Sequence, residues 1–197
     1  MVDFDPKAHG LKMKSVSRNG RYTQFALVAA QQAIEDAKLD VASIDGDRFG
    51  CIIGSGIGGV EWFERNCNSF TAAGGGYKSL RAVDPFLIPA LISNTASGMV
   101  AIEHGARGPN YCVTTACASG SHSIGAALKH LRDGDADIML AGMQEEGSVC
   151  YAVYGICPSP SLLNSPLSSS PRRQRGSHHP VMLRRLLRSD SHDGEVQ

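Results

Sequence analysis

A cysteine among small side chains is the residue of this sequence best suited to covalent chemistry. Cys117 lies in the stretch TTACASGSHSIG, directly before a helix-like run, and its neighbours from Ala116 to Ser121 are all small. A chain that turns sharply from a strand into a helix exposes the residue at the turn and admits only small neighbours there. Unpaired N–H groups and the positive end of the helix dipole favour thiolate over thiol. The pattern predicts that Cys117 forms a thioester with an acyl group, its own N–H facing the oxyanion.

A space-filling role is the alternative interpretation of Cys117, because free cysteine is among the most buried residue types. The residues alone leave both interpretations open. The other cysteines provide a contrast, since none of them lies in a turn of small residues that leads into a helix. Cys51 and Cys112 fall inside predicted strands, where burial is expected to keep a thiol protonated. The remaining three lie on a polar helix-like stretch or near the C-terminal tail: Cys67, Cys150 and Cys157.

Two histidines follow Cys117 on the same predicted helix. His122 lies five residues after the cysteine, which is more than one helical turn, so we expect its ring to face away from the thiol. We interpret His122 and His130 as surface or hydrogen-bonded histidines. The pair His178-His179 has no cysteine or acidic residue at the spacing of metal ligands. The sequence therefore predicts no metal site.

The stretch GSGIGG, residues 54–59, matches the glycine pattern of dinucleotide-binding turns and follows a strand-like run. In such turns the glycines let backbone N–H groups approach a pyrophosphate. An acidic residue about 20 positions later should then hold the ribose. The first acidic residue in reach of that role is Asp84, which precedes a proline instead of ending a strand. We therefore favour a glycine-rich turn beside a crowded site over a nucleotide site.

Alternating strand-like and helix-like runs must position these residues. Short apolar runs predict buried strands, and apolar residues at helical spacing predict helices. On the helix after Cys117 the predicted apolar stripe is Ile124, Leu128 and Leu131. The alternation predicts an α/β fold with a mainly parallel sheet that is covered on both faces. The expected strands are residues 49–54, 110–115 and 136–142, and the expected helices are residues 21–39, 94–106 and 118–134.

The composition argues against several classes of protein. Nineteen basic and nineteen acidic residues cancel, so no net charge points to nucleic acid or a membrane as partner. No apolar run approaches the ~18 residues of a membrane span, and the start resembles neither a signal nor a transit peptide. Six cysteines without paired spacing favour a reduced compartment.

The chain divides into two parts of different composition. Residues 1–147 have the patterns of a globular α/β domain, whereas residues 148–197 are rich in serine, proline and arginine. An arginine patch for nucleic acid is one interpretation of this tail. A disordered or frame-shifted segment is the favoured one, because the tail has too little apolar surface to offset its ordering entropy.

Several stretches, taken in order, resemble a known family. They are IGSGIGG, PFLIPALISNTASGMVAIEHGARGPN and NYCVTTACASGSHSIGAALKHLRDGDADIMLAG. They resemble the N-terminal half of β-ketoacyl-acyl-carrier-protein synthases of the KAS I/II type, the elongating condensing enzymes of type II fatty-acid synthesis. The resemblance runs from about Asp3 to Gly142.

The resemblance implies a thiolase-like layered α/β fold, present here in part, in a family whose members are usually homodimers. It implies that Cys117 takes an acyl chain from acyl carrier protein, and that a carrier-bound malonyl group then loses carbon dioxide and attacks the thioester. Ile92 and Ser93 match positions near the family's acyl-chain pocket, where the small Ser93 would leave room for longer chains. The glycine loop, residues 54–59, would be family architecture, and neither a metal nor a redox cofactor is implied.

Departures from the family are equally specific. After LAG the chain reads MQEEGSVCYAVYG, and the family's two catalytic histidines and supporting lysine find no match, so their roles are not transferred to His178 or His179. We expect a truncated, soluble chain that is incompetent for full turnover by itself. A non-catalytic remnant or interaction partner of an intact synthase is the alternative, and a nicotinamide-dependent oxidoreductase is a third. The compartment stays open between cytoplasm, plastid and mitochondrion.

Overall fold

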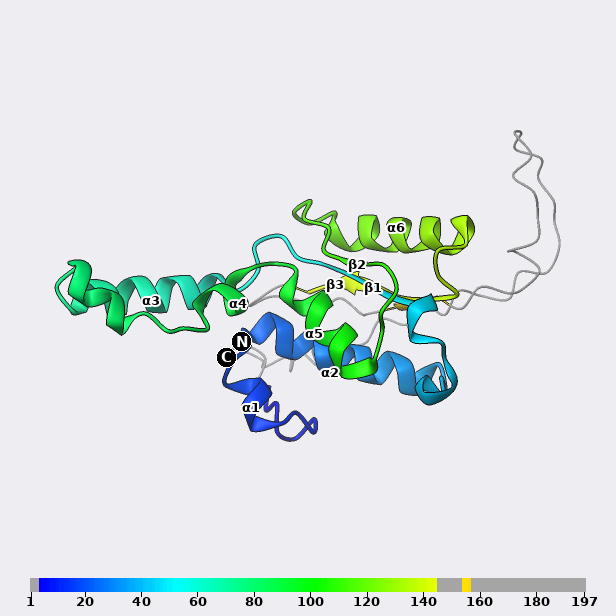
Figure 1. Cartoon of the computed structure of the whole chain (residues 1–197), viewed down its shortest axis with the longest axis horizontal. Coiled ribbons are helices and arrows are strands. Elements are labelled where there is room, and N and C mark those ends of the chain that lie inside the picture. The colour runs from blue at the N-terminus through cyan, green and yellow to red at the C-terminus, as the bar shows by residue number, and fades with distance from the viewer. Residues whose placement is uncertain (1–3, 145–153, 157–197) are drawn as a thin grey trace, which may run out of the picture.

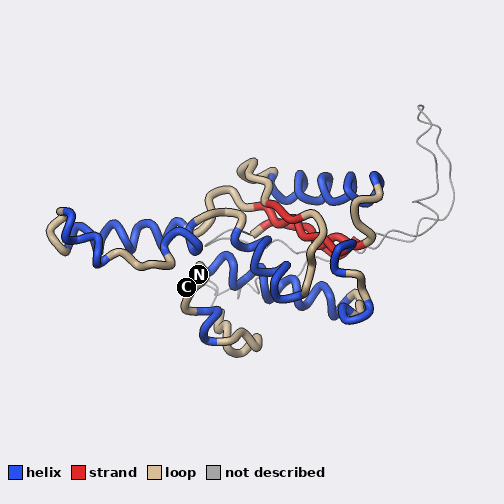
Figure 2. The backbone as a smooth tube through the Cα atoms, in the orientation of Figure 1, coloured by secondary structure: helices blue, strands red, loops and turns tan. Residues whose placement is uncertain are grey.

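A sheet between two helical layers forms the body of the molecule in the computed structural model, which describes residues 4–144 and 154–156. Figure 1 shows helix α6 (Ser119–Asp133) on one face of the sheet, and helices α2 (Arg21–Asp36) and α5 (Thr95–His104) on the other. Figure 2 shows the strands gathered between these layers. The predicted α/β fold with a covered sheet is confirmed.

The sheet has the strand order β2-β1-β3-β4. Strand β1 is parallel to both of its neighbours, and β4 is antiparallel to β3. A mainly parallel sheet is therefore confirmed, with one antiparallel edge. The strands are β1 (Phe49–Gly54), β2 (Asn110–Tyr111), β3 (Ile138–Met143) and β4 (Tyr154–Ile156).

Strands β1 and β3 form the buried centre of the sheet. Every residue of both strands is buried, and the register pairs Cys51 with Leu140 and Gly54 with Met143. Continuous apolar sequence is what a strand needs when helices cover both of its faces. The strand predicted at 49–54 is confirmed, and the one predicted at 136–142 begins two residues later and ends one residue later, at 138–143.

The strand predicted at 110–115 is wrong beyond Tyr111, where β2 ends. The Val113 carbonyl still accepts a hydrogen bond from the Ser55 N–H, at 3.3 Å. The Thr115 N–H then donates to Ser119 Oγ of α6 instead of to a neighbouring strand, and the Thr114 hydroxyl donates to Ser93. Valine and threonine have high strand propensity, but here side-chain hydrogen bonds take the place of the ladder.

Glycines mark the ends of the main helices. Helix α2 begins after Gly20, and α5 and α6 end at Gly105 and Gly134, whose φ angles are 70° and 80°. This left-handed conformation is the usual glycine ending of a helix. The helices predicted at 21–39, 94–106 and 118–134 are confirmed, with shifts of up to three residues at their ends.

The buried face of α6 differs from the predicted apolar stripe. Leu131 is buried, but Ile124 is only half-buried and Leu128 is 37% exposed. The helix packs on the sheet mainly through small side chains, and a stripe of large apolar residues therefore does not mark its buried face. Its buried residues are Ser119, Ser123, Ala127 and Leu131.

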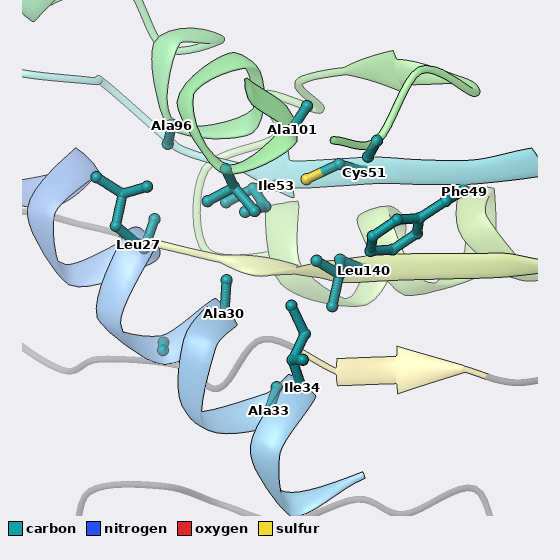
Figure 3. Close-up of a cluster of buried hydrophobic side chains, with 14 of the residues drawn as sticks. Leu27, Ala30, Ala33, Ile34, Phe49, Cys51, Ile53, Ala96, Ala101 and Leu140 are labelled. Carbon is teal, nitrogen blue, oxygen red and sulfur yellow. The ribbon is translucent and has the colours of Figure 1, made fainter. Parts of the chain in front are cut away.

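The main core lies between the sheet and the layer of α2 and α5, as Figure 3 shows. Alanines from both helices face larger side chains of the strands, which lets the layers pack closely. Helix α2 contributes Leu27 and Ile34, and Cys51 of β1 lies within the same cluster. The alanines of this cluster are Ala26, Ala29, Ala30, Ala33, Ala96, Ala101 and Ala106.

An arm extends away from the sheet and contains α3 (Val60–Ala72), a 3-10 helix (Tyr77–Ala82) and α4 (Leu87–Leu91) (Figure 1). Its return loop is held by Asp84, whose N–H donates to Asn66 Oδ1 at 2.6 Å and whose carboxylate lies 3.5 Å from Arg65. The remaining short helices are α1 (Met13–Val16) and two 3-10 turns, Val41–Ser43 and Gly46–Arg48.

The predicted domain boundary near residue 147 and the predicted disorder of residues 148–197 concern segments outside the described residues, apart from β4. Within the described part of the chain, no helix combines the length and the apolar character that crossing a membrane requires.

Candidate active site

Cys117 is exposed at a sharp turn that leads directly into α6. The residue before it, Ala116, has a φ angle of 48°, which is the left-handed region. That conformation costs a residue with a side chain roughly 1–2 kcal/mol. Ala118 follows as the N-cap, so the thiol stands beside the first turn of the helix. The sequence prediction of a tight, strained turn before a helix agrees with this geometry.

Hydrogen bonds from α6 tie the turn together. The Thr115 N–H donates to Ser119 Oγ at 2.9 Å, and the Ser119 hydroxyl donates to the Ala116 carbonyl at 2.7 Å. The Ala118 N–H also donates to the Thr115 carbonyl, at 3.1 Å. The backbone on both sides of Cys117 is therefore fixed while its side chain stays accessible.

Small residues bring the start of α6 against the ends of the central strands. A Cβ atom added to Gly54, the last residue of β1, would lie 2.8 Å from both Ser119 Cβ and Ser123 Oγ. A Cβ added to Gly120 would lie 3.2 Å from Met143 Cβ, at the end of β3. Carboxyl ends of parallel strands are a common place for functional groups in α/β proteins. The packing places Cys117 at this edge of the sheet.

The glycine loop is filled by protein and not by open space. A Cβ on Gly58 or Gly59 would lie 2.2 Å or 2.1 Å from a backbone oxygen of α4. The Gly59 N–H donates to the Leu91 carbonyl at 3.0 Å, and the Gly58 N–H donates to Ser55 Oγ at 2.9 Å. A pyrophosphate needs such N–H groups for itself, and Asp84 pairs with Arg65. The loop geometry therefore agrees with the favoured prediction of a crowded turn.

The two predicted pocket residues lie at the junction of α4 and α5. Ile92 is 43% exposed, and its carbonyl accepts a hydrogen bond from the buried Tyr22 hydroxyl. The half-buried Ser93 accepts a hydrogen bond from the Thr114 hydroxyl at 3.3 Å. Because Thr114 precedes Cys117 by three residues, the structure brings Ser93 to the segment that carries the cysteine.

The other described cysteines differ strongly from Cys117. Cys51 is fully buried in β1, and burial raises the pKa of its thiol to about 12, so the predicted protonated thiol is confirmed. Cys67 is exposed on α3. Cys112 lies just beyond β2 and is partly exposed, so its predicted place inside a buried strand is wrong. Cys150 and Cys157 lie outside the described residues.

Both histidines of α6 are hydrogen-bonded, as predicted. His122 Nδ1 lies 2.8 Å from the Thr115 hydroxyl, a contact that the sequence analysis did not foresee. His130 contacts the Tyr111 hydroxyl at 3.0 Å and Asp135 at 2.8 Å. The pair at 178–179 lies outside the described residues. Sequence reasoning also missed the role of Ser119, which it counted only as a small residue.

Known proteins are similar to this chain in sequence and in fold. The family model described as "Beta-ketoacyl synthase, N-terminal domain" matches residues 1–149. The 3-oxoacyl-[acyl-carrier-protein] synthase 2 of Staphylococcus aureus is 44% identical over 162 residues, which cover 82% of this chain and 39% of that protein.

Two solved structures extend the similarity to the fold. The ishigamide ketosynthase/chain length factor has a TM-score of 0.62 at 30% identity, over 76% of this chain and 36% of that one. AntDE:AntF, a type II PKS acyl-carrier protein in complex with its ketosynthase bound to the hexaketide, has a TM-score of 0.63 at 21% identity. That match covers 73% of this chain and 40% of the other and shows the fold alone. The chain spans about two fifths or less of the length of each of these relatives. Its helix and sheet layers are those of the thiolase-like fold. The chain belongs to the beta-ketoacyl synthase family.

Proposed function

We propose that the chain carries the nucleophilic cysteine of a β-ketoacyl-acyl-carrier-protein synthase of fatty-acid synthesis. The Cys117 thiolate attacks the carbonyl of an acyl thioester on acyl carrier protein. The bond from that carbonyl carbon to the carrier sulfur breaks, the carrier leaves as a thiolate that takes up the proton lost when Cys117 ionised, and the acyl group stays on Cys117. A malonyl thioester then loses carbon dioxide, and its carbanion displaces Cys117 to give a 3-ketoacyl chain that is two carbons longer.

One observation carries this proposal: an exposed cysteine in a strained, hydrogen-bonded turn at the start of a long helix. Helix N-termini favour anions, and the N–H groups there suit the oxyanion that forms during acyl transfer. The family supports the chemistry, and the S. aureus relative is named as a synthase that acts with acyl carrier protein.

The described part of the chain suits the acylation step better than the condensation step. Decarboxylation needs donors that hold the malonyl thioester carbonyl as negative charge develops on it. The rings of His122 and His130, the two histidines of α6, already contact Thr115, Tyr111 and Asp135. We therefore expect this chain alone to form acyl-Cys117 but to release little or no 3-ketoacyl product.

Intact-mass spectrometry tests the acylation step. We expect the chain to gain one acyl group when it is mixed with hexanoyl-acyl carrier protein, and peptide mapping to place the group on Cys117. Cys117→Ala should abolish the adduct, whereas Cys67→Ala, which removes another exposed thiol, should not. An unmodified chain that still binds the carrier or an intact synthase would favour the non-catalytic alternative.

Ser93 is the residue we propose for chain-length selection. It is half-buried and bonded to the segment that carries Cys117, so a larger side chain there would occupy space next to the acyl group. Ser93→Phe should shorten the longest acyl chain transferred to Cys117 in a series of carriers from short to long. An unchanged chain-length profile would argue against a pocket at this position.

A further inference from the structure

Thr115 is held from two sides by the first turn of α6. Its backbone N–H donates to Ser119 Oγ at 2.9 Å, and its hydroxyl lies 2.8 Å from His122 Nδ1. Residues three apart on a helix share a face, so Ser119 and His122 reach the same neighbour. Ser119 is fully buried and His122 is exposed. The contact with Ser119, the inner contact, therefore fixes the backbone N–H of Thr115. The contact with His122, the outer contact, fixes its hydroxyl at the surface.

The Ser119 hydroxyl makes a second contact with the turn. It donates to the Ala116 carbonyl at 2.7 Å while it accepts from Thr115. Ala116 has the left-handed φ angle of 48°, which such surroundings must hold in place. One buried hydroxyl thus bonds to both residues that precede Cys117 and stabilises a conformation that alanine by itself disfavours.

We propose that Ser119 and His122 are positioning residues that fix the direction of the Cys117 thiol for acyl transfer. This inference rests on the proposed function of Cys117. Both residues act through Thr115 and Ala116 and not on the substrate. Attack on a thioester carbonyl needs a narrow range of approach, whereas a small alkylating reagent reacts with an accessible thiol from many directions. The two contacts should therefore govern acylation much more than the accessibility of the thiol.

Ser119→Ala tests the inner contact, with Ser121→Ala as the matched control on the same turn, because Ser121 is exposed. We expect Ser119→Ala to slow acylation of Cys117 by hexanoyl-acyl carrier protein about 10-fold or more, since a thiol misplaced by ~1 Å can lose up to about 100-fold in rate. Alkylation of Cys117 by iodoacetamide should change little, and Ser121→Ala should behave as wild type in both assays. Thermal unfolding of each variant shows whether the chain remains folded.

A set of substitutions at His122 tests the outer contact on the surface, where folding is less at risk. The side-chain amide of asparagine can take the place of Nδ1, whereas that of glutamine reaches only the place of Nε2. We expect His122→Ala and His122→Gln to slow acylation and His122→Asn to restore it. Thr115→Val should slow acylation of Cys117 as much as His122→Ala does. The variant that carries both substitutions should be acylated no more slowly than either single variant, because each of the three lacks the same hydrogen bond. His130→Ala is the control, since its ring contacts Tyr111 and Asp135 instead.

The two failures are distinguishable. A wild-type chain that forms no acyl-Cys117 overturns the proposed function, and this inference with it. A wild-type chain that is acylated at the same rate as Ser119→Ala and His122→Ala overturns the inference alone. Equal losses in acylation and in iodoacetamide labelling would also overturn it, because they indicate a general loss of structure and not of direction.

Discussion

Two cysteines of this chain lie in opposite surroundings. Cys51 lies in the middle of β1, fully buried, and burial raises its pKa to about 12. Its carbonyl accepts a hydrogen bond from the Ser97 hydroxyl of α5 at 2.8 Å. Cys117 lies in a turn at the strand-end edge of the sheet, exposed and next to a helix start.

The difference in surroundings follows from the backbone element that carries each cysteine, because the residue type is the same. A strand covered on both faces removes water from the sulfur and disfavours the thiolate. The turn before α6 leaves the sulfur of Cys117 exposed to water, next to the N-terminus of the helix. The two regions lie close together, because the last residue of β1 packs directly on the first residue of α6.

Labelling of the native chain with iodoacetamide at pH 8 should reveal the largest difference between the two cysteines. We expect Cys117 to react at least about 1,000-fold faster than Cys51, because a thiol with a pKa near 12 is ionised in only about one molecule in 10,000 at that pH. Peptide mass mapping separates the two sites, and Cys67 on α3 gives the rate of another exposed thiol. Similar rates for Cys51 and Cys117 in the folded chain would contradict the comparison.

Alkaline unfolding tests the buried side of the comparison. The pKa of Cys51 rises from 9.0 to about 12 on folding, so the folded state keeps its proton where the unfolded state has lost it. Stability from this group is therefore complete below about pH 9 and declines by up to about 4 kcal/mol as the pH rises to 12. Cys51→Ala should flatten the dependence of unfolding free energy on pH in this window. The exposed Cys67→Ala should leave the slope unchanged, and an unchanged slope in both variants would argue against a strongly raised pKa.

Gly54→Ala tests the contact that joins the two regions. The added Cβ would lie 2.8 Å from Ser119 Cβ and from the Ser119 carbonyl oxygen, so α6 must move away from β1. We expect a loss of about 1–3 kcal/mol in unfolding free energy, as for other overpacked cores. Gly125→Ala is the control, because its Cβ meets nothing within 4 Å and alanine is the better helix former. Urea unfolding measures both, and equal effects of the two variants would contradict this role for Gly54.

Ala116→Gly has the smallest expected effect and tests the turn that carries the exposed Cys117. Glycine adopts a φ angle of 48° without strain, so we expect the free energy of unfolding to rise by up to about 1 kcal/mol. Lys38→Gly is a matched control, since Lys38 has a φ angle of 53° after α2 and far along the chain from the turn. Both variants should gain in thermal stability, but only Ala116→Gly should slow acylation of Cys117. An acylation rate affected equally by both variants would argue against a specific role for the strained turn.

The fold was largely predictable because its central elements have simple patterns. The apolar runs of β1 and β3 and the glycine endings of α5 and α6 are signals within the sequence itself. The length of β2 was not predictable. Thr114 and Thr115 have strand propensity, but the Thr115 N–H donates to Ser119 of α6 and the Thr114 hydroxyl donates to Ser93, and neither contact can be read from local sequence.

The candidate site was predictable in its centre and not in its surroundings. The small residues around Cys117 indicated the turn, since only a crowded backbone needs them. The bond between His122 and Thr115 was missed because helical spacing does not hold across the left-handed turn at Ala116, which brings Thr115 back to the helix. The buried face of α6, which consists mainly of small residues, was missed because serines such as Ser119 and Ser123 are usually found on protein surfaces.

The contact between Gly54 and Ser119 also limits how this sequence can change. No side chain at position 54 fits unless the residues opposite it retreat, and Ser119 cannot shrink to glycine without losing both of its bonds to the turn. A single substitution at either position therefore costs stability, through crowding at Gly54 or through lost hydrogen bonds at Ser119. In a library that randomises both codons together, survivors selected for a folded chain should contain mostly the original pair. The residue types allowed at the end of β1 thus depend on the residue at the start of α6, next to Cys117, and the reverse is also true.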